Sequence, residues 1–101
     1  MNTTATFETT VNNPLPSGKG TFHISRFGSV IFLPAESSAI TEAHYLTDES
    51  VMVITYKGGA KYYYQGVPAF VAFNLMVAES FGKFVNEHIK PNYRFLKNIY
   101  L

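Results

Sequence analysis

The sequence predicts an α+β fold: a three-stranded antiparallel meander followed by two helices packed on one face, with an additional N-terminal β-hairpin. Two short apolar, aromatic runs at 51–56 and 61–65 are joined at Gly58-Gly59, and glycine accepts the positive φ that a tight hairpin turn needs. The pattern from Ala69 to Ala78 has helical periodicity. A separate hydrophobic unit at 21–33 precedes both.

Three segments are expected along the chain. Residues 1–20 are rich in Thr and Asn, which predicts a flexible arm, with a marginal edge strand at 6–11 where apolar and polar residues alternate. Residues 21–36 predict the hairpin extension, because two short apolar runs flank a turn and a proline ends the second run. The main domain is expected over 37–101.

The hairpin extension contains the run Val30-Ile31-Phe32-Leu33. Four adjacent apolar residues are typical of a strand that is buried on both faces or hidden at an interface. We therefore hypothesise that the hairpin closes the sheet face that the meander leaves open. The alternatives are that it extends the sheet or swaps into a second copy of the chain.

In the central hairpin, alternate residues belong to opposite faces. Tyr62 and Tyr64 share the parity of the first strand's Met52 and Ile54, so we expect them to pack under a helix and leave Tyr63 free on the other face. The first strand of the meander is expected at 40–45, before a polar turn. The predicted core motif consists of Met52, Ile54, Tyr56, Tyr62, Tyr64, Phe70 and Phe73.

Two helices are expected to follow the meander. Pro68 suits the first helical position, and Phe70, Phe73 and Val77 form the stripe expected to face the sheet. Ser80 is the expected N-cap of a second helix that runs to Ile89. The tail from 92 to 101 remains apolar and is expected to dock as a short helix.

Composition argues against catalysis and against metal or cofactor binding. The chain has no cysteine, and its three histidines, at 23, 44 and 88, lack metal-ligand spacing. No phosphate-binding glycine loop and no nucleophile motif is present. We therefore expect a protein that is not an enzyme and that uses no cofactor.

Charge and hydropathy bear on partners and location. The net charge is only +1, but the segment 38–56 carries acidic residues alone, whereas the chain from Lys57 onward is mainly basic. A basic second half can form a local positive patch. No apolar run approaches the roughly 20 residues that a membrane helix needs, and no basic, apolar leader is evident. A cytoplasmic protein with no membrane partner is expected.

From Ser37 to Tyr93 a set of short motifs follows in a specific order: Ser37-Ser38, Ile40, Tyr45, alternating Met52, Ile54 and Tyr56, Gly58-Gly59, the pair Tyr62 and Tyr64, Val67-Pro68, Ala78-x-Ser80-x-Gly82, Phe84-Val85-Asn86, Ile89 and Tyr93. This order resembles the KTSC domain, which occurs at the C-terminus of some lysyl-tRNA synthetases and alone in small bacterial and phage proteins. The sequence departs from the family pattern at His44, where a glycine is expected, and at Lys90, where arginine is usual. The resemblance implies a single-domain protein and suggests RNA binding.

Two functions are weighed for such a module. Binding of RNA or another single-stranded nucleic acid would combine stacking aromatic rings with nearby cations. The alternative is a protein-protein interaction module, such as a phage-encoded modulator of a host factor, or a homodimer. The candidate nucleic-acid residues are Lys57, Lys61, Tyr63, Lys83, Asn86, Lys90 and Arg94. The candidate interface residues are Val51, Val53, Phe22, Ile24 and Ile31.

Overall fold

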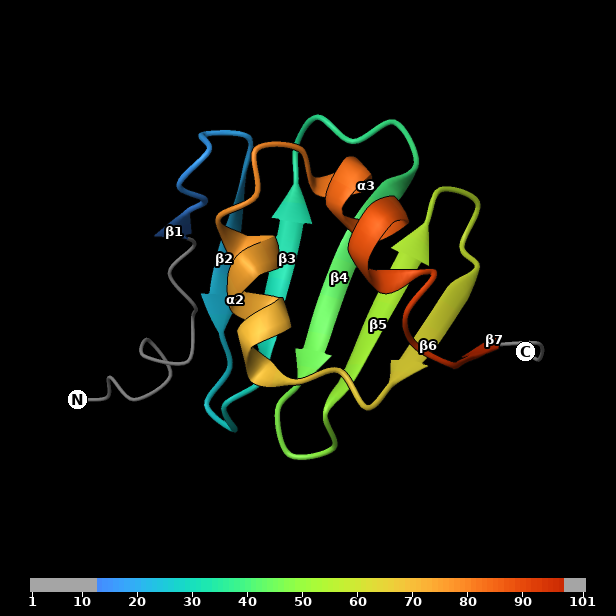
Figure 1. Cartoon of the computed structure of the whole chain (residues 1–101). Helices are drawn as coiled ribbons and strands as arrows, with labels where there is room; N and C mark the ends of the chain where they lie inside the picture. The colour runs from blue at the N-terminus through green and yellow to red at the C-terminus, as the bar shows by residue number, and fades with distance from the viewer. Residues whose placement is uncertain (1–12, 98–101) are drawn as a thin grey trace.

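A computed structural model of the chain describes residues 13–97. These residues form one seven-stranded antiparallel sheet in which the strands follow one another in chain order, from β1 to β7 (Figure 1). The strands are β1 (Asn13–Pro14), β2 (Gly20–Ile24), β3 (Val30–Pro34), β4 (Ile40–Leu46), β5 (Val51–Tyr56), β6 (Lys61–Gln65) and β7 (Phe95–Lys97). The helical elements are α2 (Ala69–Met76), α3 (Phe81–Phe84) and the π-helical turn η1 (Val85–Ile89).

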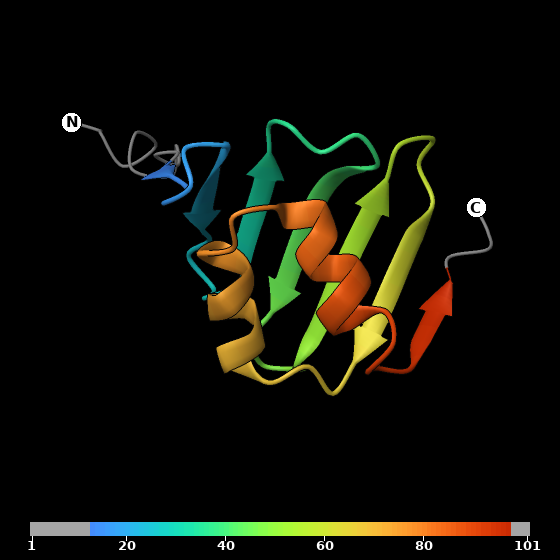
Figure 2. The same ribbon diagram turned by 45° about the horizontal axis from the view of Figure 1, so that its top comes forward.

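The helices cover one face of the sheet and leave the other face open. α2 lies over the β2–β3 side, while α3 and η1 form a continuous helical segment over β4 and β5 (Figure 2). The buried core lies between these two layers and includes Phe32, Met52, Ile54 and Leu75. Phe32 joins the layers directly, because its ring centroid lies 5.9 Å from that of Phe81.

The predicted three-stranded meander with a separate hairpin extension is wrong. The meander exists as β4, β5 and β6, but it is the middle of a sheet of seven strands. β3 pairs with β4 through Phe32 opposite Ala43, so the hairpin β2–β3 extends the sheet and leaves the open face uncovered. The apolar run of β3 is explained by this position, since Phe32 faces the helices while Ile31 faces the opposite side.

The central hairpin follows its predicted register. Met52 lies opposite Tyr64 and Ile54 opposite Tyr62, so these four side chains share the helix-covered face. Gly58 and Gly59 have φ values of 98° and 99° within the loop that joins the strands. Met52, Ile54 and Tyr64 are fully buried, whereas Tyr56 and Tyr62 are partly buried against the same core.

Helix α2 is rotated relative to its predicted orientation. The residues that face the sheet are Val71, Ala72 and Leu75, while Phe70 is 66% exposed and Phe73 59% exposed, so their assignment to the core is wrong. An apolar helix with no charged residue has no polar face to set its rotation. The rotation follows instead from the buried segment before the helix, where Pro68 is the N-cap and the Tyr45 hydroxyl donates to the Val67 carbonyl at 2.7 Å.

The second helical segment begins as predicted. The Ser80 hydroxyl accepts the Lys83 backbone N–H at 3.3 Å, which identifies Ser80 as the N-cap of α3. Its last turn widens into the π-helical turn η1, where the Lys90 N–H donates to the Val85 carbonyl. Val85 and Ile89 project from this turn into the core.

Both ends of the described chain add edge strands to the sheet. The tail forms β7, which pairs with β6 through Phe95 opposite Tyr64, so the expected short helix is wrong. At the other end, β1 pairs with β2, and Leu15 is only 4% exposed. The predicted arm is therefore part of the packed structure from residue 13 onward, and the strand expected at 6–11 lies outside the described residues.

Candidate nucleic-acid interface

Acidic and basic residues are concentrated in different halves of the sequence, and the order of the strands places them on different halves of the sheet. From residue 13 to 50 the described chain carries Lys19 and Arg26 against four acidic residues. From residue 51 to 97 it carries six lysine and arginine residues against Glu79 and Glu87. The strands are arranged in chain order, so the basic part of the sequence forms the β5–β7 half of the molecule. Helix α2 crosses back over β2 and β3, but it has no charged residue and does not alter this distribution.

Aromatic rings and lysines meet on the helix-covered side of β6 and β7. The Tyr62 ring centroid lies 5.0 Å from that of Phe95, which is 46% exposed. The Lys97 Nζ lies 5.7 Å from the Tyr62 ring centroid, and the Lys90 Nζ lies 6.0 Å from the ring centroid of Tyr56. We call Tyr62, Phe95, Lys90 and Lys97 the β6–β7 platform.

The rings beneath this platform form a connected cluster. Tyr56 and Tyr62 meet edge to face, with centroids 5.3 Å apart, while Tyr62 and Tyr64 stack at 6.2 Å. Burial raises the pKa of the Tyr64 hydroxyl above its ordinary value, and the neighbouring Tyr56 and Tyr62 add to this effect. Tyr64 is therefore held in its neutral form, as its buried position beneath the platform requires.

The open face presents a different arrangement. A row of side chains crosses it from β3 to β7, formed by Ile31, His44, Val53, Tyr63 and Leu96. Leu96 is 60% exposed at the β7 end. Lys61 lies beside this row, and its ammonium group donates to the Thr55 hydroxyl at 3.0 Å.

The predicted nucleic-acid residues are divided by the sheet. Lys61 and Tyr63 lie on the open face, whereas Lys90 lies on the helix-covered side over Tyr56. Lys57 is in the loop between β5 and β6, and Arg94 precedes β7, where its carbonyl accepts the Gln65 N–H at 2.9 Å. These residues share the basic half but do not form one patch.

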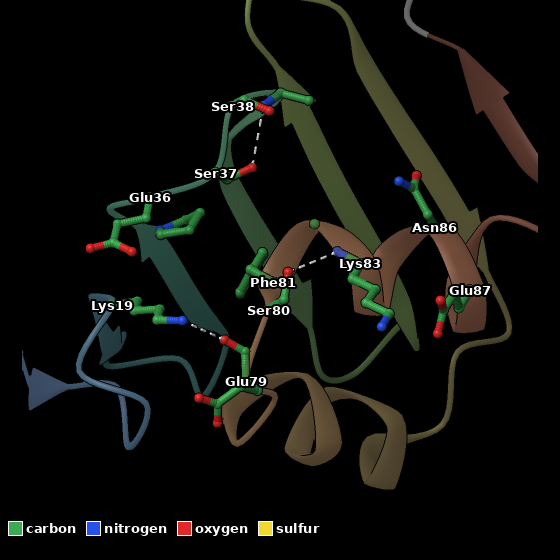
Figure 3. Close-up of a pocket in the computed structure, with 13 residues that line it drawn as sticks. Lys19, Glu36, Ser37, Ser38, Glu79, Ser80, Phe81, Lys83, Asn86 and Glu87 are labelled. Atoms are coloured by element: carbon green, nitrogen blue, oxygen red, sulfur yellow. Dashed lines mark hydrogen bonds between the residues drawn. The ribbon is translucent and has the colours of Figure 1, made fainter.

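Lys83 and Asn86 line a separate polar pocket of about 430 Å³ between the β3–β4 loop and the start of α3 (Figure 3). Its walls carry charges of both signs, from Lys19 and Lys83 and from three glutamates. The serines at the pocket have structural roles: Ser80 caps α3, and the Ser37 hydroxyl accepts the Ile40 N–H at 3.0 Å.

The predicted interface residues are also divided between the two faces. Phe22 is partly buried and packs against the core on the helix-covered side, so it is not part of the open face. Val53 faces the open side but is only 7% exposed, because His44 and Tyr63 flank it on the neighbouring strands. Ile31 and Val51 are partly buried on that face, while Ile24, at the end of β2, is 58% exposed.

His44 lies within the open face, and folding lowers the pKa of its imidazole. Burial lowers the pKa of its imidazole, the positive charges of His23 and Lys61 lower it further, and Glu42 acts in the opposite direction. The His44 Nε2 lies 3.0 Å from the Ser29 hydroxyl, which holds the ring in place.

This depressed pKa predicts a dependence of stability on pH. The unfolded chain binds a proton at His44 near pH 6.5, whereas the folded chain binds it only at lower pH. The free energy of unfolding should therefore fall as pH is lowered through 6.5 and level off below the folded pKa. Urea unfolding at a series of pH values measures this effect. His44→Gln should remove this component, while His88→Gln, at an exposed position on η1, should retain it; equal curves for wild type and His44→Gln would contradict it.

The sequence reasoning missed Phe95 and Lys97 as site residues and treated Tyr62 only as core. A signal was present, because Phe95 and Lys97 alternate with Leu96 and so belong to one face of a strand.

Among residues 13–97, no group of three or more histidine or acidic side chains is placed to hold a metal ion. No helix in that range is long and apolar enough to cross a membrane.

Comparisons with known proteins identify this class of small domain. The sequence matches the KTSC domain over residues 36–93, more than half of the chain, and the protein belongs to the KTSC domain family. A protein from Tsukamurella paurometabola is 46% identical over 61 residues, which cover 60% of this chain and 91% of that protein.

The fold is also similar to that of a solved structure. The crystal structure of a KTSC domain protein from Yersinia pestis matches with a TM-score of 0.59 and 33% sequence identity, covering 64% of this chain and 92% of that one. The family match begins after β3. Strands β1, β2 and β3 therefore lie before the matched region, and β7 lies after it.

Packing explains part of the family's motif. Ser37-Ser38 and Ser80-x-Gly82 are about 40 residues apart in the chain, yet they meet at the polar pocket. A Cβ atom added to Gly82 would lie 3.6 Å from the Ser37 hydroxyl oxygen. The two halves of the motif thus join the start of β4 to the start of α3.

Proposed function

We propose that this KTSC domain protein is a non-enzymatic, cytoplasmic module that binds single-stranded RNA or DNA on the β6–β7 platform. The observation that carries the proposal is an exposed aromatic surface between two lysines in the basic half of the sheet. Bases stack on aromatic rings regardless of sequence, and lysines beside the rings neutralise phosphates. Phe95 and Tyr62 supply the rings, and Lys90 and Lys97 supply the cations.

The platform favours a single strand over a duplex. Its exposed ring, Phe95, is on a three-residue edge strand, where an unstacked base can approach from the side. A duplex hides the faces of its bases, so stacking on a side chain requires bases that are already free. Arg94, directly before β7, adds a third cation near the same edge.

Binding to a labelled single-stranded oligonucleotide, measured by fluorescence anisotropy at several salt concentrations, tests this function. Contacts from three cations predict that the logarithm of the affinity falls with the logarithm of salt concentration with a slope of about −2. Matched duplex RNA and DNA should bind more weakly at every salt concentration. The proposal fails if neither single-stranded RNA nor DNA binds at low salt.

The open face supports a second candidate function, the binding of a protein partner, such as a host factor. Leu96 is 60% exposed on that face, at the end of the row that contains Tyr63, Val53, His44 and Ile31. An exposed apolar side chain beside other apolar groups is typical of the edge of a protein interface. Association through this face should be insensitive to salt and should be lost in Leu96→Glu, whereas nucleic-acid binding should fall steeply with salt.

A further inference from the structure

The outer side of α2 carries an apolar surface that has no partner among the described residues. Phe70, Phe73 and Val77 are 66%, 59% and 45% exposed, and we call these three residues the α2 stripe. The buried side of the same helix is occupied by smaller residues, Val71, Ala72 and Leu75. Large aromatic side chains held in solvent, while smaller ones are buried, indicate an interaction surface.

The spacing within the α2 stripe is that of a helix–helix seam. Phe73 follows Phe70 by three residues, and Val77, the C-cap residue that ends α2, follows Phe73 by four. This alternation of three and four places side chains on one line along a helix, as in the contact between two packed helices. The occupant best matched to the stripe is therefore another apolar helix of similar length.

The absence of charge on α2 favours a second copy of the same helix. At an isologous interface each residue near the two-fold axis faces its own counterpart, so any charge there meets a like charge. From Ala69 to Met76 the helix has no charged residue, and Asn74 is its one polar side chain. The centre of such an interface would thus be uncharged and self-complementary.

The area available indicates a weak complex. Two phenylalanine side chains of roughly 200 Å² each, exposed to 66% and 59%, offer about 250 Å² per protomer. A stable interface buries roughly 800 Å² per partner, so the stripe supplies the core of an interface and the surrounding residues its rim. We propose that two copies of this chain associate through their α2 stripes, packed antiparallel about a two-fold axis.

This dimer is independent of the nucleic-acid function. α2 lies over the β2–β3 side of the sheet, whereas the β6–β7 platform lies at the opposite edge (Figure 1). Association through α2 would leave both platforms accessible. Loss of dimerisation should therefore leave the intrinsic affinity of one protomer for a short oligonucleotide unchanged, and the two proposals can fail separately.

Sedimentation of the full chain over a range of concentrations tests the proposal. The expected result is a monomer–dimer equilibrium with a dissociation constant in the micromolar range or weaker. Phe73→Glu should weaken dimerisation at least about tenfold, because it places two carboxylates across the axis. Phe27→Glu is the matched control: Phe27 is 84% exposed in the β2–β3 turn, and its substitution should leave the equilibrium unchanged.

Disulfide trapping gives a second measurement, since the chain contains no cysteine. Phe70→Cys, Phe73→Cys and Val77→Cys are oxidised separately, with Phe27→Cys as control, and at least one of the three should form covalent dimers faster than the control. A monomer at every concentration overturns the proposal, as does a dimer that Phe73→Glu leaves intact. If the chain is monomeric and removal of residues 1–12 makes amide hydrogen exchange in α2 faster, the α2 stripe is covered by those residues and not by a second copy of the chain.

Discussion

Phe32→Ala should reduce the free energy of unfolding by about 3–5 kcal/mol, the range for removing a large buried aromatic side chain. Phe32 is fully buried, lies opposite Ala43 on β4, and contacts Phe81 of α3. It thus connects the β2–β3 hairpin, which precedes the residues matched to the family, to both the sheet and the helical layer. Domains of this size are stable by only about 5–15 kcal/mol, so this loss is a large share of the total.

Urea unfolding followed by circular dichroism measures this loss. Phe27→Ala is the matched control, since it removes the same side chain from an exposed turn, and its effect should stay within about 0.5 kcal/mol. If Phe32→Ala lost less than about 1 kcal/mol, the hairpin would be an appendage with a separate core. A large loss with one cooperative transition indicates a single folding unit from β1 to β7.

Reversing the charge of both platform lysines should produce the largest change in nucleic-acid affinity. Lys90→Glu with Lys97→Glu replaces two phosphate contacts by two repulsive charges, so binding at low salt should weaken by at least about a hundredfold, and the salt slope should shrink from about −2 to about −0.7, the value for the one remaining cation, Arg94. Phe95→Ala should weaken binding about five- to hundredfold, because stacking of one base contributes roughly 1–3 kcal/mol. These side chains are exposed, so thermal unfolding should change little.

Two controls distinguish the platform from other basic sites. Lys19→Glu introduces a like change in charge in the acidic half of the sheet, where the lysine ammonium lies 3.4 Å from the Glu79 carbonyl oxygen, and it should weaken binding only slightly. Tyr63→Ala removes the aromatic ring of the open face and should leave the affinity unchanged. If Tyr63→Ala abolished binding while the platform variants did not, the nucleic acid would lie on the open face instead.

Sequence reasoning succeeded where one short-range period determines the structure. Alternation along 51–65 placed Met52, Ile54 and Tyr64 on the covered face and Tyr63 on the open one, and the register confirms this arrangement. Ser80 was identified as a helix cap because its role depends on residues only three positions away. The family was also recognised from motif order, and the match over 36–93 confirms it.

Prediction from the sequence failed where contacts between residues far apart in the chain determine the structure. α2 is apolar on both sides, so its sequence does not determine which stripe is buried, and Val67 and Tyr45 set the rotation instead. β7 is a strand because β6 offers a free edge to it. For the candidate nucleic-acid interface, the sequence identified lysines that could bind phosphate. Only the arrangement of the sheet shows that Lys61 and Lys90 lie on opposite faces.

The short strands at both edges of the sheet limit unwanted polymerisation. In the described chain, β1 has two residues, one of them Pro14, which has no N–H to donate, and β7 has three. Sheets with long, flat edges recruit further chains and form fibres, and short edges with proline resist this. Because β1, β2 and β3 lie on one side of β4 and β5 on the other, the longest described strand, with seven residues, is interior to the sheet and offers no free edge at which aggregation could begin.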